Sequence, residues 1–102
     1  YSVFNGGDSI TVGAGSLISG FVYLQTSMHG FKNKELKVQE QGYNHAPVHL
    51  GNDTWLGTHV VILPGVVLGK GVVVGSNAVV TKSADDFKVL GGIPAKELKE
   101  RE

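Results

Sequence analysis

The sequence contains no cysteine, only one methionine, one tryptophan and three prolines among its 102 residues. The absence of cysteine excludes a disulfide framework, a thiol nucleophile and a cysteine-based zinc site, and it fits a cytoplasmic location. No apolar stretch reaches the roughly 18 residues of a membrane span without interruption by glycine or a polar residue, and no signal peptide is visible. Nine basic and nine acidic side chains give a formal net charge of zero. Nothing in the charge therefore favours nucleic acid or an anionic membrane as a partner.

Glycine is the residue in excess, and it accompanies an internal repeat. The chain has 15 glycines, against about 7 at average usage, and its length suits one domain. Residues 50–85 divide into six consecutive blocks of six: LGNDTW, LGTHVV, ILPGVV, LGKGVV, VGSNAV and VTKSAD. The residues that lead these blocks are all aliphatic: Leu50, Leu56, Ile62, Leu68, Val74 and Val80. The same period occurs upstream at Val12, Ile18 and Leu24.

A period of six predicts neither a helix nor a coiled-coil heptad. It fits a short strand followed by a turn, because glycine supplies turn conformations that side chains forbid. Stacked blocks of this kind form a parallel β-helix. We expect three blocks to make one triangular coil of 18 residues, with the leading aliphatic residues stacked inside. The predicted fold is therefore all-β.

Two segments break the period. Residues from about 25 to 47 are mostly polar and lack the blocks of six, so we expect an excursion loop that leaves the coil and returns to it. A loop of this length in a compact domain is typically functional or disordered. The second break is at the C-terminus, where AKELKERE follows Pro94 and has good helix propensity. We predict a β-helix domain over residues 1–92 and a short helix over 93–102 that caps the stack.

Several motifs resemble those of one known family. The stretches HLGNDTWLGTHVVILPGVVLGKGVVVGSNAVVTKS and VLGGIPAKELK are similar to the WIG motif, the ILPGV turn, the AVVTK strand and the G-x-PAK ending of hexapeptide-repeat acetyltransferases. The resemblance runs from about Val12 to the C-terminus, and the excursion MHGF…QEQGY…P is most similar to sugar and polysaccharide O-acetyltransferases. It implies a left-handed parallel β-helix and a homotrimer with active sites between subunits. It also implies acetyl-coenzyme A as the co-substrate and, as the acceptor, a hydroxyl or amino group of a small molecule such as a sugar or polysaccharide unit.

Acetyl transfer needs a general base, and histidine is the residue type best suited to that role here. Transfer from a thioester to a hydroxyl needs a base near the acceptor oxygen and a donor facing the developing oxyanion. A neutral imidazole suits the first role, and without cysteine a direct attack within a ternary complex is simpler than a covalent acetyl-enzyme. His29 in SMHGF matches the family position of the catalytic histidine, so we expect it to be the general base. The alternative is a loop histidine that only caps backbone groups.

The other three histidines have weaker assignments. His45 lies in the excursion before Pro47 and could touch the acceptor. His49 and His59 occupy positions that should point outward, although His59 could approach the cofactor groove. Carbonic anhydrases of this fold class bind metal through histidines on neighbouring coils, but the acidic and glutamine partners of that site are not evident here. We predict no metal.

The resemblance also implies further site residues. Those expected to contact coenzyme A are Gly57, Thr58, Ser76, Thr81, Lys82, Lys96 and Lys99. Among them, Thr58 would meet the pantetheine arm or the thioester oxygen, and the lysines of the C-terminal segment would meet the phosphates. Those expected near the acceptor are Asp8, Glu40, Gln41 and Trp55.

Members of the family are typically longer than this chain, with further coils before the part seen here. The chain begins at Tyr1 and not at methionine, so we expect a fragment or a shortened member. Two other functions therefore stay open. One is an inactive β-helical module that only trimerises, and the other is an acyl-carrier-linked or sugar-nucleotide acyltransferase of the same fold.

Overall fold

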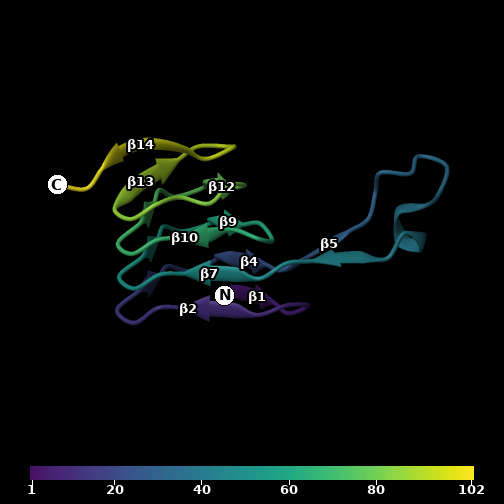
Figure 1. The fold of residues 1–102 in the computed structure, drawn as a ribbon, viewed down its shortest axis with the longest axis horizontal. Coiled ribbons are helices and arrows are strands. Elements are labelled where there is room, and N and C mark those ends of the chain that lie inside the picture. The colour runs from purple at the N-terminus through teal and green to yellow at the C-terminus, as the bar shows by residue number, and fades with distance from the viewer.

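The computed structural model describes all 102 residues, which form short strands and a single 3-10 turn. Figure 1 shows the strands stacked in successive coils, with one hairpin that projects from the stack. In chain order the elements are β1 (Val3–Asn5), β2 (Ile10–Val12), β3 (Leu17–Ile18), β4 (Tyr23–Gln25), β5 (Ser27–His29), η1 (Val38–Glu40), β6 (Tyr43–His45), β7 (Val48–Leu50), β8 (Trp55–Leu56), β9 (Val61–Ile62), β10 (Val67–Leu68), β11 (Val73–Val74), β12 (Val79–Val80), β13 (Lys88–Gly91) and β14 (Lys96–Glu100). No helix in the structure has the length and apolar character needed to cross a membrane.

Three parallel sheets form the faces of a triangular stack. The first face has the order β1-β4-β9-β12, the second β2-β7-β10, and the third β3-β8-β11-β13 with β14 at its edge. The chain visits the three faces in turn, so the fold is a parallel β-helix, as predicted. We call the turn from the first to the second face the first corner, the turn from the second to the third face the second corner, and the turn from the third back to the first face the third corner.

The strand register confirms the expected coil length. His49 pairs with Val67, 18 residues further on, and Trp55 pairs with Val73 over the same spacing. Tyr23, in contrast, pairs with Val61, 38 residues further on. The additional twenty residues belong to the excursion, which leaves the coil at the first corner.

The core consists of the aliphatic ladders that the repeat predicts. The residues that lead the six blocks are at most 1% exposed, and they stack coil upon coil through the strand register. Val12, in contrast, is 38% exposed because the first coil has a neighbouring coil on only one side. The ladders stabilise the stack by burying side chains that each contribute about 1.5–3 kcal/mol.

The predicted C-terminal helix is wrong. Lys96–Glu100 form strand β14, which pairs antiparallel with β13. Helix propensity is a weak preference, and a helix of this length is marginal in water. Strand β13 instead offers an open edge of backbone groups on the third face, and pairing with that edge satisfies the hydrogen bonds of both segments.

The excursion leaves the stack as a two-stranded antiparallel ribbon of β5 and β6, with the 3-10 turn η1 in its outer part. Figure 1 shows it extending well away from the coils. Its side chains are almost all exposed.

Candidate active site

The ribbon carries four chemically useful side chains on one of its faces. Ser27 lies opposite His45, and His29 lies opposite Tyr43. Because alternate residues of a strand point to the same side, all four share one face. The rings of His29 and Tyr43 are 4.4 Å apart between centroids and tilted by 35°, whereas those of Tyr43 and His45 are 6.1 Å apart and stacked. Ser27 Oγ and His45 Nδ1 are hydrogen-bonded at 2.7 Å.

The base of the ribbon is fixed by Thr26, which is completely buried. Its hydroxyl accepts hydrogen bonds from the amides of Gly7 (3.0 Å) and Asp8 (3.2 Å) and donates one to the carbonyl of Asn5 at 2.5 Å. Asp8 is exposed, and its carboxylate accepts a hydrogen bond from the amide of Ser9 at 2.7 Å. The predicted acceptor residue Asp8 thus lies in the first coil, next to the segment from which the ribbon starts.

Glu40 and Gln41 lie at and just after η1, in the outer part of the ribbon. Glu40 is exposed. The side-chain amide of Gln41 donates to the carbonyls of Asn33 (2.9 Å) and Leu36 (3.2 Å), and its oxygen accepts from the amide of Asn33. These three bonds hold the loop together, so Gln41 has a structural role here. Its predicted contact with the acceptor stays a prediction.

Gly57, Thr58 and Ser76 lie together at the third corner, in adjacent coils. A Cβ atom added to Gly57 would lie 2.7 Å from Ser76 Oγ and 2.8 Å from the Ser76 amide nitrogen. The missing side chain therefore allows the two coils to approach closely. The hydroxyl of Thr58 donates to the carbonyl of Gly20 at 2.9 Å and is 2.8 Å from Nδ1 of His59.

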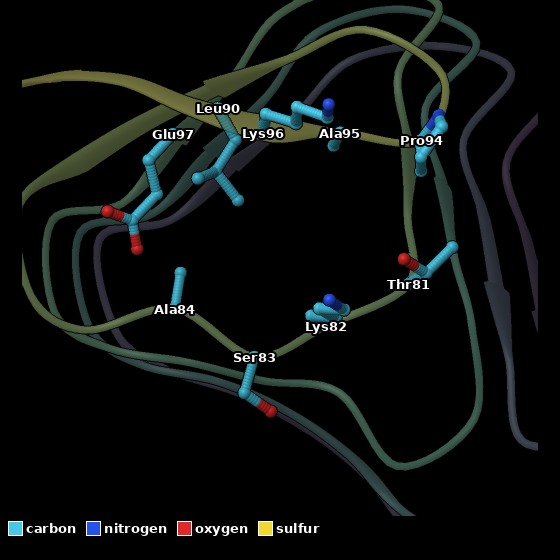
Figure 2. A pocket seen from close by; sticks show the side chains of 9 residues that line it. All are labelled: Thr81, Lys82, Ser83, Ala84, Leu90, Pro94, Ala95, Lys96 and Glu97. Atoms are coloured by element: carbon cyan, nitrogen blue, oxygen red, sulfur yellow. The ribbon is translucent and has the colours of Figure 1, made fainter.

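Thr81, Lys82 and Lys96 line one cavity of about 330 Å³ at the C-terminal end of the stack. Figure 2 shows its two walls: the segment 81–84 on one side, and Leu90 with the segment 94–97 on the other. Two lysine ammonium groups are available to this cavity. Glu97 also lines it, so the local charge is only partly positive.

Trp55 and Lys99 lie on the third face. Trp55 is 51% exposed and stands in register between Leu17 and Val73. Lys99 is exposed on β14 opposite Val89. It does not line the cavity that holds the other two predicted lysines.

The predicted site residues therefore form separate groups within one chain. His29 is on the ribbon beyond the first corner, the pair Thr58 and Ser76 is at the third corner, and Trp55 is on the third face, which lies across the coil from the first corner. Sequence reasoning missed Ser27 and Tyr43. The alternation of Ser27 with His29 and of Tyr43 with His45 was the available signal, but it identifies one shared face only once the two segments are known to pair.

The remaining histidines lie on the surface. His49 is exposed on β7, and His59 is exposed at the third corner with its ring stacked on Phe21, 5.0 Å between centroids. No three histidine or carboxylate side chains lie close enough together to hold a metal ion.

The bacterial transferase hexapeptide (six repeats) family matches residues 47–82. The chain is 35% identical over 92 residues to galactoside O-acetyltransferase of Escherichia coli, an alignment that covers 90% of this chain and 44% of that protein. The structure of a galactoside acetyltransferase in complex with coenzyme A covers 97% of this chain and 48% of its own, with a TM-score of 0.89 and 31% identity. A hexapeptide-repeat acetyltransferase of Vibrio cholerae, complexed with acetyl coenzyme A, covers 97% of this chain and 53% of its own, with a TM-score of 0.87 and 29% identity.

These findings define the class of the protein, a left-handed β-helix of hexapeptide repeats. Residues 47–82 carry the repeat of the bacterial transferase hexapeptide family, and the resemblance seen in the motifs is confirmed. The chain spans between a quarter and just over a half of the length of the curated relatives reported for it.

Proposed function

We propose that the chain is the acetyl-transferring part of an O-acetyltransferase that moves an acetyl group from acetyl-coenzyme A to a hydroxyl of a sugar-type acceptor. The observation that carries this proposal is the match of 97% of the chain, at a TM-score of 0.89, to a galactoside acetyltransferase with coenzyme A. The exposed face of the ribbon supports it, because it presents an imidazole at the family position of the base.

His29 acts as the general base in this proposal. Its imidazole takes the proton of the acceptor hydroxyl as the oxygen attacks the thioester carbonyl. The C–O bond forms, the C–S bond breaks, and the leaving thiolate of coenzyme A takes up the proton that His29 accepted, which returns the imidazole to its neutral form. A donor is needed where negative charge develops on the carbonyl oxygen, and the candidate is the backbone N–H of Thr58 at the third corner, because the Thr58 hydroxyl already donates to the carbonyl of Gly20. Acceptor and acetyl-coenzyme A are bound at the same time, with no covalent acetyl-enzyme.

Two groups of residues in this chain suit different parts of coenzyme A: one its extended arm and the other its phosphates. Thr58 and Ser76 line adjacent coils at the third corner, where an extended arm could run parallel to the axis of the stack. Lys82 and Lys96 flank the cavity at its C-terminal end and suit phosphate groups, although a lysine binds as a point charge and without the bidentate fork of an arginine.

The separation of these groups supports a homotrimer in which neighbouring subunits complete each site. The ribbon extends far beyond its own coils (Figure 1), and Trp55 is half exposed on a face that the ribbon of the same chain does not cover. A ribbon that reaches the third face and third corner of a neighbour would bring His29 to Trp55 and Thr58. A cytoplasmic location stays a prediction.

The test combines cofactor binding with catalysis. Acetyl-coenzyme A should raise the melting temperature of the protein, and acetyl transfer to sugar acceptors should be measurable by release of free thiol. His29→Ala should reduce transfer by roughly 100- to 10,000-fold and leave the thermal protection in place. His49→Ala is the matched control, because it removes an exposed histidine from the second face.

Two results would contradict the proposal. If acetyl-coenzyme A neither binds nor shifts the melting temperature, the chain is an inactive trimerisation module. If transfer survives the loss of His29, another group is the base. A strong preference for long acyl groups on a carrier protein would instead favour the acyl-carrier-linked alternative.

A further inference from the structure

The imidazole of His45 is held in a defined position on the same face as His29. Ser27 Oγ contacts its Nδ1 at 2.7 Å, and Ser27 is the cross-strand partner of His45. A hydroxyl can donate or accept, so Ser27 serves either tautomer of the ring. Nε2 is left without any hydrogen-bond partner in the protein, on a side chain that is exposed.

The first coil is shaped to admit this pair. A Cβ atom at residue 7 would lie 2.0 Å from Ser27 Oγ and 2.4 Å from His45 Nδ1, so a side chain at this position would displace the pair. The amide of Gly7 is in turn held by the buried Thr26. The first coil therefore leaves room for His45 and Ser27 in this arrangement.

Tyr43 lies between the two imidazoles and is 61% exposed. Its ring contacts that of His29 and stacks toward that of His45. His29 and His45 are diagonal neighbours on this antiparallel ribbon, and such pairs are separated by roughly 7 to 8 Å. The ribbon face is therefore an aromatic surface with one imidazole at each side. The proposed function already assigns one of them, His29, to the acceptor hydroxyl that reacts.

We propose that His45 is a second acceptor-binding residue and that the ribbon face selects carbohydrate rings with at least two free hydroxyls. This inference rests on the proposed function. One hydroxyl reacts at His29, a second is hydrogen-bonded by His45 Nε2, and the apolar C–H face of the ring packs on Tyr43. Ser27 is a positioning residue that acts through His45. An acceptor with a single hydroxyl would leave His45 unsatisfied, and its affinity would be lower for that reason.

The experiment compares two ring-shaped acceptors in acetyl transfer: a methyl pyranoside, and cyclohexanol, which has one hydroxyl. The unaltered protein should prefer the pyranoside. His45→Ala should lower kcat/KM for the pyranoside by roughly tenfold to a hundredfold, mainly through a higher KM. For cyclohexanol, kcat/KM of this variant should stay within about twofold of that of the unaltered protein. Ser27→Ala should produce a smaller loss of the same kind, and His49→Ala none. An equal loss with both acceptors would overturn the proposal.

A second measurement separates this inference from the proposed function. The methyl pyranoside is titrated into the protein without acetyl-coenzyme A, and the imidazole resonances are followed by NMR. The signals of His29 and His45 should shift, and that of His49 should not. If the resonances of His29 and His45 shift but no acetyl transfer is measured, the proposed function is overturned and the ribbon face remains a carbohydrate-binding surface. If transfer is measured but the His45 resonance does not shift, the proposal that His45 binds the acceptor is overturned. Unchanged melting temperatures of the variants exclude misfolding as the cause.

Discussion

At the scale of single residues, the cost of replacing a glycine depends on what lies next to it in the neighbouring coil. Gly57 leaves no room for a Cβ atom, because Ser76 Oγ, its amide nitrogen and its Cα would all lie within 3.0 Å. Two of these three atoms are backbone and cannot move without shifting a coil. Gly20 lies at the same corner one coil earlier, and a Cβ atom added to it would have no atom within 4 Å.

The matched substitutions Gly57→Ala and Gly20→Ala therefore have different expected effects. Gly57→Ala should destabilise the fold by about 1–3 kcal/mol through overpacking, and Gly20→Ala should be close to neutral. Urea unfolding followed by circular dichroism measures both. Equal effects of the two substitutions would show that backbone freedom, and not contact between coils, decides the cost.

The inner ladder leads to a second prediction at this scale. Leu68 is completely buried, whereas its neighbour Val67 on the same strand is 47% exposed. Leu68→Ala should cost about 2–5 kcal/mol, because it removes buried surface and leaves a cavity between coils. Val67→Ala should cost far less in the same unfolding measurement. Similar costs for both would contradict the assignment of the inner face.

At the scale of elements, β14 is held to the third face partly by charge. Lys88 Nζ donates to Glu100 Oε1 at 2.6 Å and lies 3.7 Å from Glu97 Oε2. The hydrogen bond from Lys88 lowers the pKa of Glu100, and the same bond to the carboxylate raises the pKa of Lys88. Farther along the tail, Arg101 contacts Asp53 at 3.2 Å and the carbonyl of Gly71 at 3.0 Å. These pairs are exposed, so each makes a small contribution.

The shifted pKa values predict how pairing of β14 depends on pH. Because the folded pKa of Glu100 is lowered, its contribution is complete above the ordinary glutamate pKa and is lost as pH falls through the folded value. Lys88 has the opposite sign, and its contribution is lost as pH rises through its raised pKa. Protection of the β14 amides from hydrogen exchange, corrected for intrinsic rates, should be greatest near neutral pH and fall a few-fold at about pH 3. In Glu100→Gln this fall should be smaller, and an unchanged pH profile would exclude the pair as its cause.

At the scale of the whole molecule, the outward side of the third face carries a column of apolar residues. Leu17, Trp55, Val73 and Val89 form one outward column in register across four strands. Leu17 is 66% exposed and Trp55 is 51% exposed. Exposed apolar surface of this kind is typical of protein–protein contacts, and the proposed trimer would cover it.

Substitution in this column tests the assembly. The protein should sediment as a trimer, and Trp55→Glu should shift it toward the monomer because a buried unpaired charge opposes association. Val67→Glu, on the second face, is the control and should leave the sedimentation coefficient unchanged. A wild-type protein that sediments as a monomer at micromolar concentration would contradict the trimer. Circular dichroism distinguishes loss of assembly from loss of fold.

The sequence predicted most of the fold because the repeat is a local pattern. Each block of six begins with an aliphatic residue that points inward, so Leu56, Ile62 and Leu68 could be assigned to the core without knowledge of any distant contact. The candidate site was only partly predictable. His29 and Lys82 followed from motifs, whereas Ser27 and Tyr43 did not, because their importance depends on which strand pairs with which.

By itself the sequence determined the period, the coil length, the inner ladders and the position at which the chain leaves the stack. Each of these depends on side-chain size and backbone freedom within a few residues. Only the tertiary structure decided that 96–100 pair as a strand, because an open edge at β13 outweighs the weak helix preference of AKELKERE. It also decided that Ser27 holds His45 beside His29, since these segments meet through the register of a ribbon whose two strands are far apart in the chain.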